Sequence, residues 1–447
     1  MVEQEGKTDF STLTPERREN HNLLRGVFLV EGAKRAALYD TNTGSVYSIN
    51  REAVEAIKEE DNDQEFRSKL ISLNLVHAQE VLEMESTALE TEIPKPVLQF
   101  AWLEITDKCN ERCLHCYGNF SPGGRETFSK SLSHDEWKNI IHSLAINGCS
   151  QIQFIGGEPF KYRGAAKELT VLDLVEFARE CGIEFIEIFT NGTLVSEEAV
   201  KRIKELGIQI AISLYSSDPN IHDFVTQTPG SYKKTIRSIG LLKEADIPVR
   251  AAVIVMKQNQ NTIEETLQMV QRLGLNLRMP DVVRPTGRAQ MIDIMPNVQT
   301  LLRYGLISKP NFLTDPISFH RNHFYHTCLA GKIAITTEGK VIPCIFSRNQ
   351  TMGDLKEQEL EEILQSEKLD ENWKSTKDKV LVCRDCEYRY ACFDCRPLAE
   401  GSGCGSYTEA PFPRCTYNPY NGQWGMGIWK INNHGEIVYE DLSKICE

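Results

Sequence analysis

The sequence predicts an α/β protein with a parallel sheet at its centre. From about residue 98 to 290, near-continuous apolar segments alternate with amphipathic segments of helical periodicity. Apolar strands of this kind are buried on both faces, which is typical of parallel sheets covered by helices. With 447 residues, 41% of them hydrophobic and 25% charged, the chain is long enough for two or three domains. We therefore expect a doubly wound sheet or a barrel, flanked by smaller domains.

A small strand-helix module is expected ahead of this sheet. Three β-rich segments separated by turn sequences such as TNTG predict short strands at 26–32, 36–40 and 45–49. Amphipathic stretches then predict helices near 51–60 and 64–73. A connector rich in charge and threonine leads from this module to the sheet.

Five apolar segments predict the strands of the central sheet: 97–106, 151–157, 183–192, 208–215 and 249–256. The helix after the first strand is expected to begin at Ser133, which can form a capping box with Glu136, and to end at Gly148. Another helix is expected in the sequence SEEAVKRIKELG, residues 196–207. This alternation places every second element on the outside of the sheet.

Polar and cysteine residues gather at the carboxyl ends of four consecutive strands. In chain order they are Cys109, Cys113 and Cys116; Gly156, Gly157, Glu158 and Pro159; Thr190, Asn191 and Gly192; and Ser213. Ligands of parallel α/β folds bind at this end of the strands. We therefore expect all four features to meet at one mouth of the sheet.

The first of these features has an unusual number of cysteines. Cys109, Cys113 and Cys116 form a Cys-x3-Cys-x2-Cys run that stops at three. Cubic iron-sulfur clusters normally take four thiolates, and tetrahedral structural zinc also takes four ligands. The run therefore indicates a metal centre with one position left open.

Bulk features indicate where the protein works. The amino terminus is polar and no apolar run approaches the ~20 residues of a membrane span, so we expect a cytoplasmic protein without a membrane partner. In a reducing compartment the 14 cysteines are better explained as metal ligands or catalytic thiols than as disulfides. The net charge of −13 argues against nucleic-acid binding, which needs a basic face.

The carboxyl-terminal part of the chain has the densest cysteine spacing. Eight cysteines suit two metal sites: Cys328, Cys344, Cys383, Cys386, Cys392, Cys395, Cys404 and Cys415. Taken alone, the neighbouring Cys-x2-Cys pairs also fit a structural zinc knuckle. Cys149, Cys181 and Cys446 are expected to be packed or exposed thiols.

The three-cysteine run followed by the sequence GGEP resembles the radical S-adenosylmethionine (radical SAM) superfamily. The resemblance implies a partial (β/α)6, TIM-like barrel with a 4Fe-4S cluster on Cys109, Cys113 and Cys116. The open iron would be chelated by the amino and carboxylate groups of S-adenosylmethionine. By the same resemblance, the remaining cofactor-binding residues are Gly156, Gly157, Glu158 and Pro159 for the methionine amino group, Asn191 and Ser213 for its carboxylate or ribose, and His115 and Tyr117 for the adenine.

The carboxyl-terminal cysteines resemble the SPASM extension of radical SAM enzymes, a twitch-type domain that holds up to two auxiliary 4Fe-4S clusters. MGDLKEQELEEILQS resembles the connecting helix of that extension, although the last two cysteines of the central run are separated by two residues instead of the usual three. The partition we expect is Cys328, Cys344 and Cys395 for the first auxiliary cluster and Cys383, Cys386, Cys392 and Cys415 for the second. Cys404 is either the fourth ligand of the first cluster, or that iron is open to a substrate thiolate.

The amino-terminal module resembles the winged-helix elements that bind leader peptides in peptide-modifying enzymes by adding a strand. A DNA-binding winged helix has the same pattern, but the acidic charge favours a peptide. The expected domains are a tail at 1–23, the recognition module at 24–95, the barrel at 96–310 and the SPASM domain at 311–447.

Together these resemblances predict a radical SAM peptide maturase. We expect it to install thioether crosslinks, from cysteine sulfur to carbon, in a ribosomally synthesised precursor through a 5'-deoxyadenosyl radical, as sactipeptide and ranthipeptide synthases do. A flavodoxin or ferredoxin is the expected reductant. The alternatives are a maturase that forms carbon-carbon or carbon-oxygen crosslinks, a sulfatase-maturating enzyme, and a non-catalytic iron-sulfur or zinc protein that senses redox state.

Overall fold

The computed structural model describes residues 23–58, 64–76, 95–124, 131–165, 168–277, 279–307, 310, 312–401, 406–432 and 434–441. Nearly all of the expected amino-terminal tail, and the cysteines Cys404 and Cys446, lie outside the described residues. In the described part of the chain, no helix is both long enough and apolar enough to cross a membrane.

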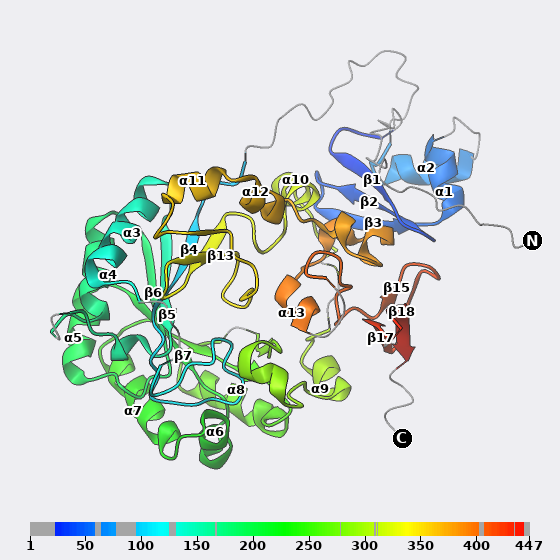
Figure 1. Cartoon of the computed structure of the whole chain (residues 1–447). Helices are drawn as coiled ribbons and strands as arrows, with labels where there is room; N and C mark the ends of the chain where they lie inside the picture. The colour runs from blue at the N-terminus through cyan, green and yellow to red at the C-terminus, as the bar shows by residue number, and fades with distance from the viewer. Residues whose placement is uncertain are drawn as a thin grey trace, which may run out of the picture.

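A curved sheet forms the centre of the molecule (Figure 1). It has nine strands in the order β10-β8-β7-β6-β5-β4-β12-β13-β14. The pairs from β10 to β12 are parallel, and β13 and β14 continue the sheet as antiparallel strands. The strands are β4 (Phe100–Thr106), β5 (Gln151–Gly156), β6 (Phe185–Thr190), β7 (Gln209–Ser213), β8 (Val249–Ala252), β10 (Asn276–Leu277), β12 (Lys332–Ile335), β13 (Lys340–Ile342) and β14 (Gly353–Asp354). The predicted parallel α/β fold is confirmed.

Helices cover the outer face of this sheet (Figure 1). They are α3 (His134–Ile146), α4 (Val171–Glu180), α5 (Glu197–Leu206), α6 (Pro219–Thr226), α7 (Ser231–Glu244) and α8 (Ile263–Arg272). Helix α3 has the predicted capping box between Ser133 and Glu136. Helix α5 lies within the predicted segment 196–207: it begins after Ser196, whose side chain caps it, and ends at Gly207, whose φ of 61° favours glycine.

The alternation of side chains along each strand separates an apolar outer layer from a polar inner layer. On β6, Ile186 and Ile188 belong to the core under the helices, whereas Glu187 is buried on the opposite face. Glu187 accepts hydrogen bonds from Arg250 at 2.7 Å and from Gln209 at 2.7 Å. These hydrogen bonds fill the inner face of the sheet near the amino ends of the strands. The inner face near the carboxyl ends is where the site residues lie.

The segment predicted as one strand at 249–256 is divided in two. β8 ends at Ala252, and β9 (Ile254–Val255) pairs with β11 (Asp281–Val282) in a separate parallel sheet. The backbone N–H of Asp281 donates to the carbonyl of Val253 at 3.1 Å, so the chain changes partner at this point. The segment after β11 thereby reaches the mouth of the main sheet.

The amino-terminal module has the predicted element order. Its antiparallel sheet, β1-β2-β3, is followed by two helices. The elements are β1 (Val27–Glu31), β2 (Ala36–Asp40), β3 (Ser45–Ile49), α1 (Arg51–Lys58) and α2 (Gln64–Ser72). One face of the sheet packs on the helices through Leu38, Ile57 and Leu70.

The carboxyl-terminal part departs from expectation in two respects. It extends the central sheet, because β12 pairs with β4 in parallel. In addition, MGDLKEQELEEILQS is helical only at its end, as its first residues form β14. The remaining elements are α9 (Val298–Arg303), α10 (Pro316–Phe324), α11 (Leu360–Gln365), α12 (Glu367–Trp373), α13 (Arg396–Gly401), β15 (Tyr417–Asn418), β16 (Gln423–Trp424), β17 (Gly427–Ile431) and β18 (Ile437–Asp441).

Candidate functional site

The three-cysteine run lies in a loop directly after β4, at the predicted mouth of the sheet. This loop is tied to the end of α6, since Arg112 and Leu114 donate their backbone N–H groups to the carbonyls of Thr226 and Val225 at 3.2 and 2.9 Å. Burial raises the pKa of the Cys113 thiol, and the nearby Glu111, Cys116 and Cys109 raise it further. The three thiols are therefore close neighbours, with Cys109 buried and Cys113 and Cys116 partly buried.

Two glycines bring the loop after β5 against the cysteine loop. A Cβ on Gly156 would lie 2.3 Å from the carbonyl oxygen of Thr106, and one on Gly157 would lie 2.3 Å from that of Lys108. The backbone N–H of Gly157 donates to Thr106 at 2.7 Å, and that of Glu158 donates to Lys108 at 2.9 Å. Only glycine permits this approach, so the predicted GGEP sequence acts first through its backbone.

The carboxylate of Glu158 joins two of the predicted features. It is fully buried and accepts hydrogen bonds from the Thr190 hydroxyl at 2.7 Å, the Asn191 N–H at 2.9 Å and the Phe160 N–H at 3.0 Å. Burial raises its pKa, and these three hydrogen bonds oppose that rise. In this arrangement Glu158 holds the GGEP and TNG loops together, which is a positioning role. Its expected contact with the methionine amino group stays a prediction.

Asn191 and Ser213 reach the same mouth from β6 and β7. The Asn191 amide donates to the side chain of Asn110 at 3.1 Å and lies 3.9 Å from the Cys109 sulfur, and its oxygen accepts from Thr193. Ser213 is buried at the end of β7. Both residues therefore lie where the sequence predicts them, with Asn191 also bracing the cysteine loop.

The two residues expected to flank the adenine lie on different sides of the loop. The His115 ring packs edge-on against the Tyr215 ring, with 4.7 Å between the ring centroids. Its buried Nδ1 has no hydrogen-bond partner in the described chain. Burial, with Arg288 nearby, lowers the pKa of His115 to about 4, so the ring is neutral at pH 7. The Tyr117 ring instead packs against the ring of Phe346, which belongs to the carboxyl-terminal part, with 5.3 Å between the ring centroids.

Sequence reasoning missed the segment that braces the cysteine loop from the other side. Arg288 donates from Nε to the Cys113 carbonyl at 2.9 Å and from Nη2 to the Phe120 carbonyl at 2.9 Å. A Cβ on Gly287 would lie 2.4 Å from the carbonyl oxygen of Cys116. The available signal for this contact was the pair Gly287-Arg288 after an apolar segment. The residues that the pair contacts are far away in the sequence, so the pair alone did not indicate them.

A buried ion pair links the sheet to the carboxyl-terminal part next to the loop. Glu104 points inward from β4, is fully buried, and pairs with Arg348, whose guanidinium lies 6.0 Å from the Tyr117 ring. The second carboxylate oxygen of Glu104 has no partner in the described chain. This pair was also missed, because a single Glu in an apolar strand carries no pattern.

The carboxyl-terminal cysteines fall into two groups. Burial raises the pKa of the Cys344 thiol to about 12, and the nearby Cys328 and Cys395 add to this rise. These three cysteines form the first group. Arg284 donates from Nε to the Cys395 sulfur at 3.4 Å, and its guanidinium stacks on Phe346 at 4.6 Å. Cys404, the other candidate for this group, lies outside the described residues.

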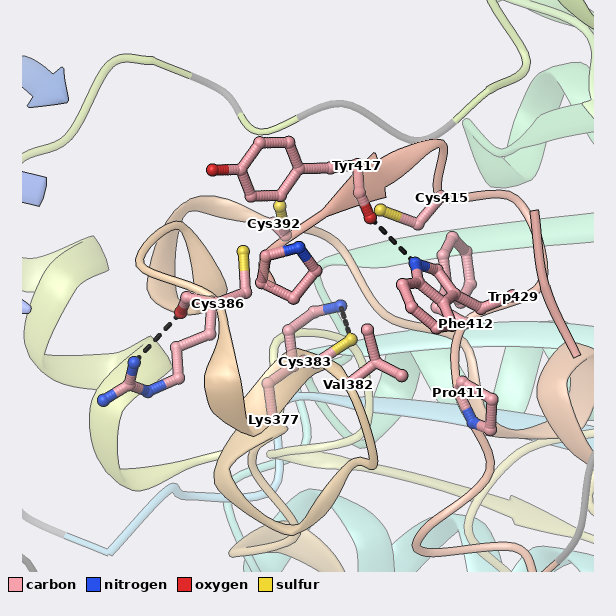
Figure 2. Close-up of a pocket in the computed structure, with 12 residues that line it drawn as sticks. Lys377, Val382, Cys383, Cys386, Cys392, Pro411, Phe412, Cys415, Tyr417 and Trp429 are labelled. Carbon is pink, nitrogen blue, oxygen red and sulfur yellow. Dashed lines mark hydrogen bonds between the residues drawn. The ribbon is translucent and has the colours of Figure 1, made fainter. Parts of the chain in front are cut away.

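The second group surrounds a pocket lined by Cys383, Cys386, Cys392 and Cys415, with Lys377 reaching Cys383 (Figure 2). The Lys377 ammonium lies 3.9 Å from the Cys383 sulfur and 5.3 Å from the Phe412 ring. Although burial opposes it, the nearby thiols and Asp394 raise the pKa of Lys377, which therefore stays charged. Burial and then Cys383 raise the pKa of Cys415 to about 11.

Asp394 joins the two groups. Its side chain is 2% exposed, accepts a hydrogen bond from Arg396 at 2.6 Å, and lies 3.5 Å from Nε2 of His326. The other ring nitrogen of His326 accepts the backbone N–H of Cys328 at 3.0 Å. Asp394 is one of the two residues between Cys392 and Cys395 in the sequence CFDC, where the SPASM extension usually has three. This sequence thus places a carboxylate between the two groups.

The donor chemistry of these groups fits iron-sulfur clusters. Thiolate sulfur is the ligand that such clusters take. Every predicted metal-binding cysteine in the described chain belongs to one of three groups, in which Cys109, Cys344 and Cys395 are buried and the others are partly buried. The groups have the same members as the predicted partition, which stays a prediction for the ligands themselves. Cys149 donates to the carbonyl of Gln151 at 3.3 Å, and Cys181 ends α4, so both are ordinary packed thiols.

Comparison with known proteins gives two family matches. The model of the radical SAM superfamily matches residues 103–270, and the model of the SPASM iron-sulfur cluster-binding domain matches residues 328–387. These spans contain the three-cysteine run and four of the carboxyl-terminal cysteines: Cys328, Cys344, Cys383 and Cys386.

Three known proteins illustrate the likeness. An AdoMet-dependent heme synthase of Methanosarcina barkeri is 27% identical over 71% of this chain and 96% of its own length. The antilisterial bacteriocin subtilosin biosynthesis protein AlbA of Bacillus subtilis is 27% identical over 68% of this chain and 69% of its own. The structure of Streptococcus suis SuiB bound to precursor peptide SuiA has a TM-score of 0.55 at 14% identity, covering 87% of this chain and 98% of SuiB. That last likeness shows the fold.

Proposed function

This chain is a radical SAM enzyme with a SPASM iron-sulfur domain, and we propose that it installs thioether crosslinks in a ribosomally synthesised precursor peptide. The observation that carries the proposal is the grouping of the cysteines into three, three and four in the described chain. A cluster with three protein thiolates has an iron for S-adenosylmethionine at the barrel mouth. We propose that the group of Cys328, Cys344 and Cys395 holds a second such cluster, whose open iron binds a substrate thiolate in place of Cys404. The likeness to AlbA, whose name refers to bacteriocin biosynthesis, supports a peptide substrate.

The proposed reaction balances without an external oxidant. When bound, the cluster at Cys109, Cys113 and Cys116 would supply the electron that breaks the C5'–S bond of S-adenosylmethionine, giving methionine and a 5'-deoxyadenosyl radical. That radical would take a hydrogen atom from the acceptor carbon and leave as 5'-deoxyadenosine. The peptide loses that C–H bond and the S–H bond of a cysteine and gains one C–S bond. The thiol proton leaves to solvent, and an auxiliary cluster would accept the electron released on closure of the C–S bond. A flavodoxin or ferredoxin in the cytoplasm is the proposed source of the first electron.

The chain's own residues prepare this chemistry by positioning and by excluding water. Arg288 and Asn191 fix the cysteine loop, and Glu158 holds together the two loops that face it. The Glu104–Arg348 pair joins the barrel to the carboxyl-terminal domain beside Tyr117. The free carboxylate oxygen of Glu104 is an acceptor for a donor group of the bound cofactor or peptide.

The assay uses synthetic precursor peptides, one for each cysteine-containing short open reading frame found near the gene. The anaerobically loaded enzyme is incubated with each peptide, S-adenosylmethionine and dithionite, and the product is alkylated and analysed by mass spectrometry. A thioether removes two hydrogen atoms per crosslink and one alkylatable thiol. A carbon-carbon or carbon-oxygen crosslink removes two hydrogen atoms but leaves every thiol alkylatable, and that result would reject the thioether proposal in favour of its alternative.

We propose further that the amino-terminal module binds the leader of this precursor at the outer edge of β3. The support is that this edge already takes an extended segment: Val46 donates its N–H to the Phe312 carbonyl at 3.0 Å, and Thr314 donates to the Gly44 carbonyl at 2.9 Å. Because successive backbone N–H groups point to alternate sides of a strand, the N–H of Ser48 points to the same side as that of Val46. An added strand at this edge is a recognised mode of peptide binding.

Replacement of Ser48 by proline tests this mode. The change removes one outward N–H and leaves the pairing of β3 with β2 in place. We expect leader affinity, measured with a fluorescent leader peptide, to fall at least about tenfold, which corresponds to ~1.4 kcal/mol. Ser48→Ala keeps the N–H and is expected to bind normally. Normal binding by the proline variant would show that the leader binds elsewhere.

A further inference from the structure

Each carboxyl-terminal cysteine group has a cation beside one of its sulfurs. Beside the barrel group the neighbours are mixed, because the Glu111 carboxyl group accepts from the Cys113 sulfur at 3.5 Å and Arg288 donates to the Cys113 carbonyl at 2.9 Å. Beside the carboxyl-terminal groups, two cations approach the sulfurs themselves, while the buried Asp394 carboxylate lies between the groups. Arg284 donates to the Cys395 sulfur at 3.4 Å, and the Lys377 ammonium lies 3.9 Å from the Cys383 sulfur.

Both cations are built into the protein interior. The Arg284 side chain is 15% exposed, is held by Asp281 at 2.7 Å, and stacks on Phe346. Lys377 is 6% exposed and lies over the Phe412 ring at 5.3 Å. A buried charge acts strongly on its neighbours because little water screens it. These are therefore fixed features of the two sites.

Their effect on an iron-sulfur cluster follows from electrostatics. Reduction adds negative charge to a cluster, so a cation that donates a hydrogen bond to a ligand sulfur stabilises the reduced form and raises the reduction potential. Arg284 and Lys377 thus favour a higher potential for the cluster beside each of them.

We infer that Lys377 and Arg284 are positioning residues, and that each raises the reduction potential of the auxiliary cluster beside it. A higher potential favours transfer of the electron released on closure of the C–S bond to that cluster. This direction of electron transfer rests on the proposed function. The potentials themselves do not, since they are set by the chain without any peptide.

The test is a redox titration of the anaerobically loaded full chain, followed by electron paramagnetic resonance. The background carries Ala at Cys109, Cys113 and Cys116, so that only the auxiliary clusters contribute. We expect Lys377→Met to lower the midpoint of one auxiliary cluster and Arg284→Met to lower that of the other. Lys377→Arg, which keeps the charge, is expected to restore the midpoint, and Lys374→Met is the control because Lys374 is 52% exposed.

Two results would overturn the inference. One is an unchanged midpoint in a Met variant that retains its full iron content. The other is loss of one cluster's iron in Lys377→Met and in Lys377→Arg alike, which would show that Lys377 serves assembly and not potential. Neither result bears on thioether formation, which the alkylation assay measures separately, so failure of this inference and failure of the proposed function are distinguishable.

Discussion

At the scale of single residues, buried charges organise the carboxyl-terminal cysteine groups. Asp394 lies between Cys392 and Cys395, and its carboxylate faces Arg396 and His326 in a region with almost no solvent. His326 in turn accepts the backbone N–H of Cys328. One carboxylate therefore fixes the spacing between segments that are far apart in the sequence.

Replacement of Asp394 by alanine is expected to be strongly destabilising. The change leaves the fully buried guanidinium of Arg396 without its counter-charge, which costs about 3–5 kcal/mol of unfolding free energy. Denaturant unfolding of the anaerobic protein measures this loss. Glu197→Ala removes a pair whose side chains are 73% and 58% exposed, and it is expected to cost no more than about 1 kcal/mol. Equal losses in the two variants would contradict the role given to Asp394.

At the scale of elements, the site depends on how closely the loops at the strand ends approach one another. Gly156 and Gly157 let the loop after β5 pair with the backbone just before Cys109. Glu158 then ties this loop to the end of β6. The cysteine loop is thus held by backbone contacts that tolerate no added side-chain atoms.

Replacement of Gly157 by alanine is therefore expected to weaken cofactor binding. The new Cβ would lie 2.3 Å from the Lys108 carbonyl oxygen, so the loop must move at a cost of about 1–3 kcal/mol. Equilibrium binding of S-adenosylmethionine to the loaded enzyme is the measurement. Gly240→Ala is the matched control, because a Cβ there meets nothing within 4 Å. Wild-type affinity in Gly157→Ala would show that the close approach is unimportant.

Elements with local signals were predictable from the sequence, and contacts between distant segments were not. The capping box at Ser133, the ends of α5 and the three strands of the module depend on neighbouring residues, and all were predicted. Arg288 and Arg348 act on partners 175 and 244 residues away, so no spacing in the sequence announces them. The pairing of β12 with β4 was missed for the same reason.

At the scale of the whole molecule, the amino-terminal module lies beside the carboxyl-terminal part of the chain (Figure 1). Its sheet buries Val30 and Tyr39 in one aromatic cluster with Phe319 and Tyr390 of the carboxyl-terminal part. This cluster packs against Cys386, Cys392 and Cys415 of the second cysteine group. The Tyr39 hydroxyl donates to the carbonyl of Glu387 at 3.0 Å, directly after Cys386. The module therefore also covers one side of the second auxiliary site.

Replacement of Tyr39 by alanine is expected to loosen this cover. Loss of a fully buried aromatic ring costs about 3–5 kcal/mol, and we expect the loaded protein to lose the iron of one auxiliary cluster on exposure to a chelator. Iron analysis and thermal unfolding are the measurements. Tyr420→Ala, which removes a side chain from a residue that is 50% exposed, is the control. Full iron retention with an unchanged melting temperature would contradict the covering role.

The central claim, that Cys109, Cys113 and Cys116 hold the cluster that cleaves S-adenosylmethionine, is tested most directly by replacing all three with alanine. The loop lies beyond the strand, so we expect the fold and the auxiliary iron to survive. The measurement is 5'-deoxyadenosine formed from S-adenosylmethionine and dithionite, with iron counted in the same sample. We expect the wild-type enzyme to form 5'-deoxyadenosine and the triple variant, with only its auxiliary iron, to form none. Continued formation of 5'-deoxyadenosine by the triple variant would contradict the assignment.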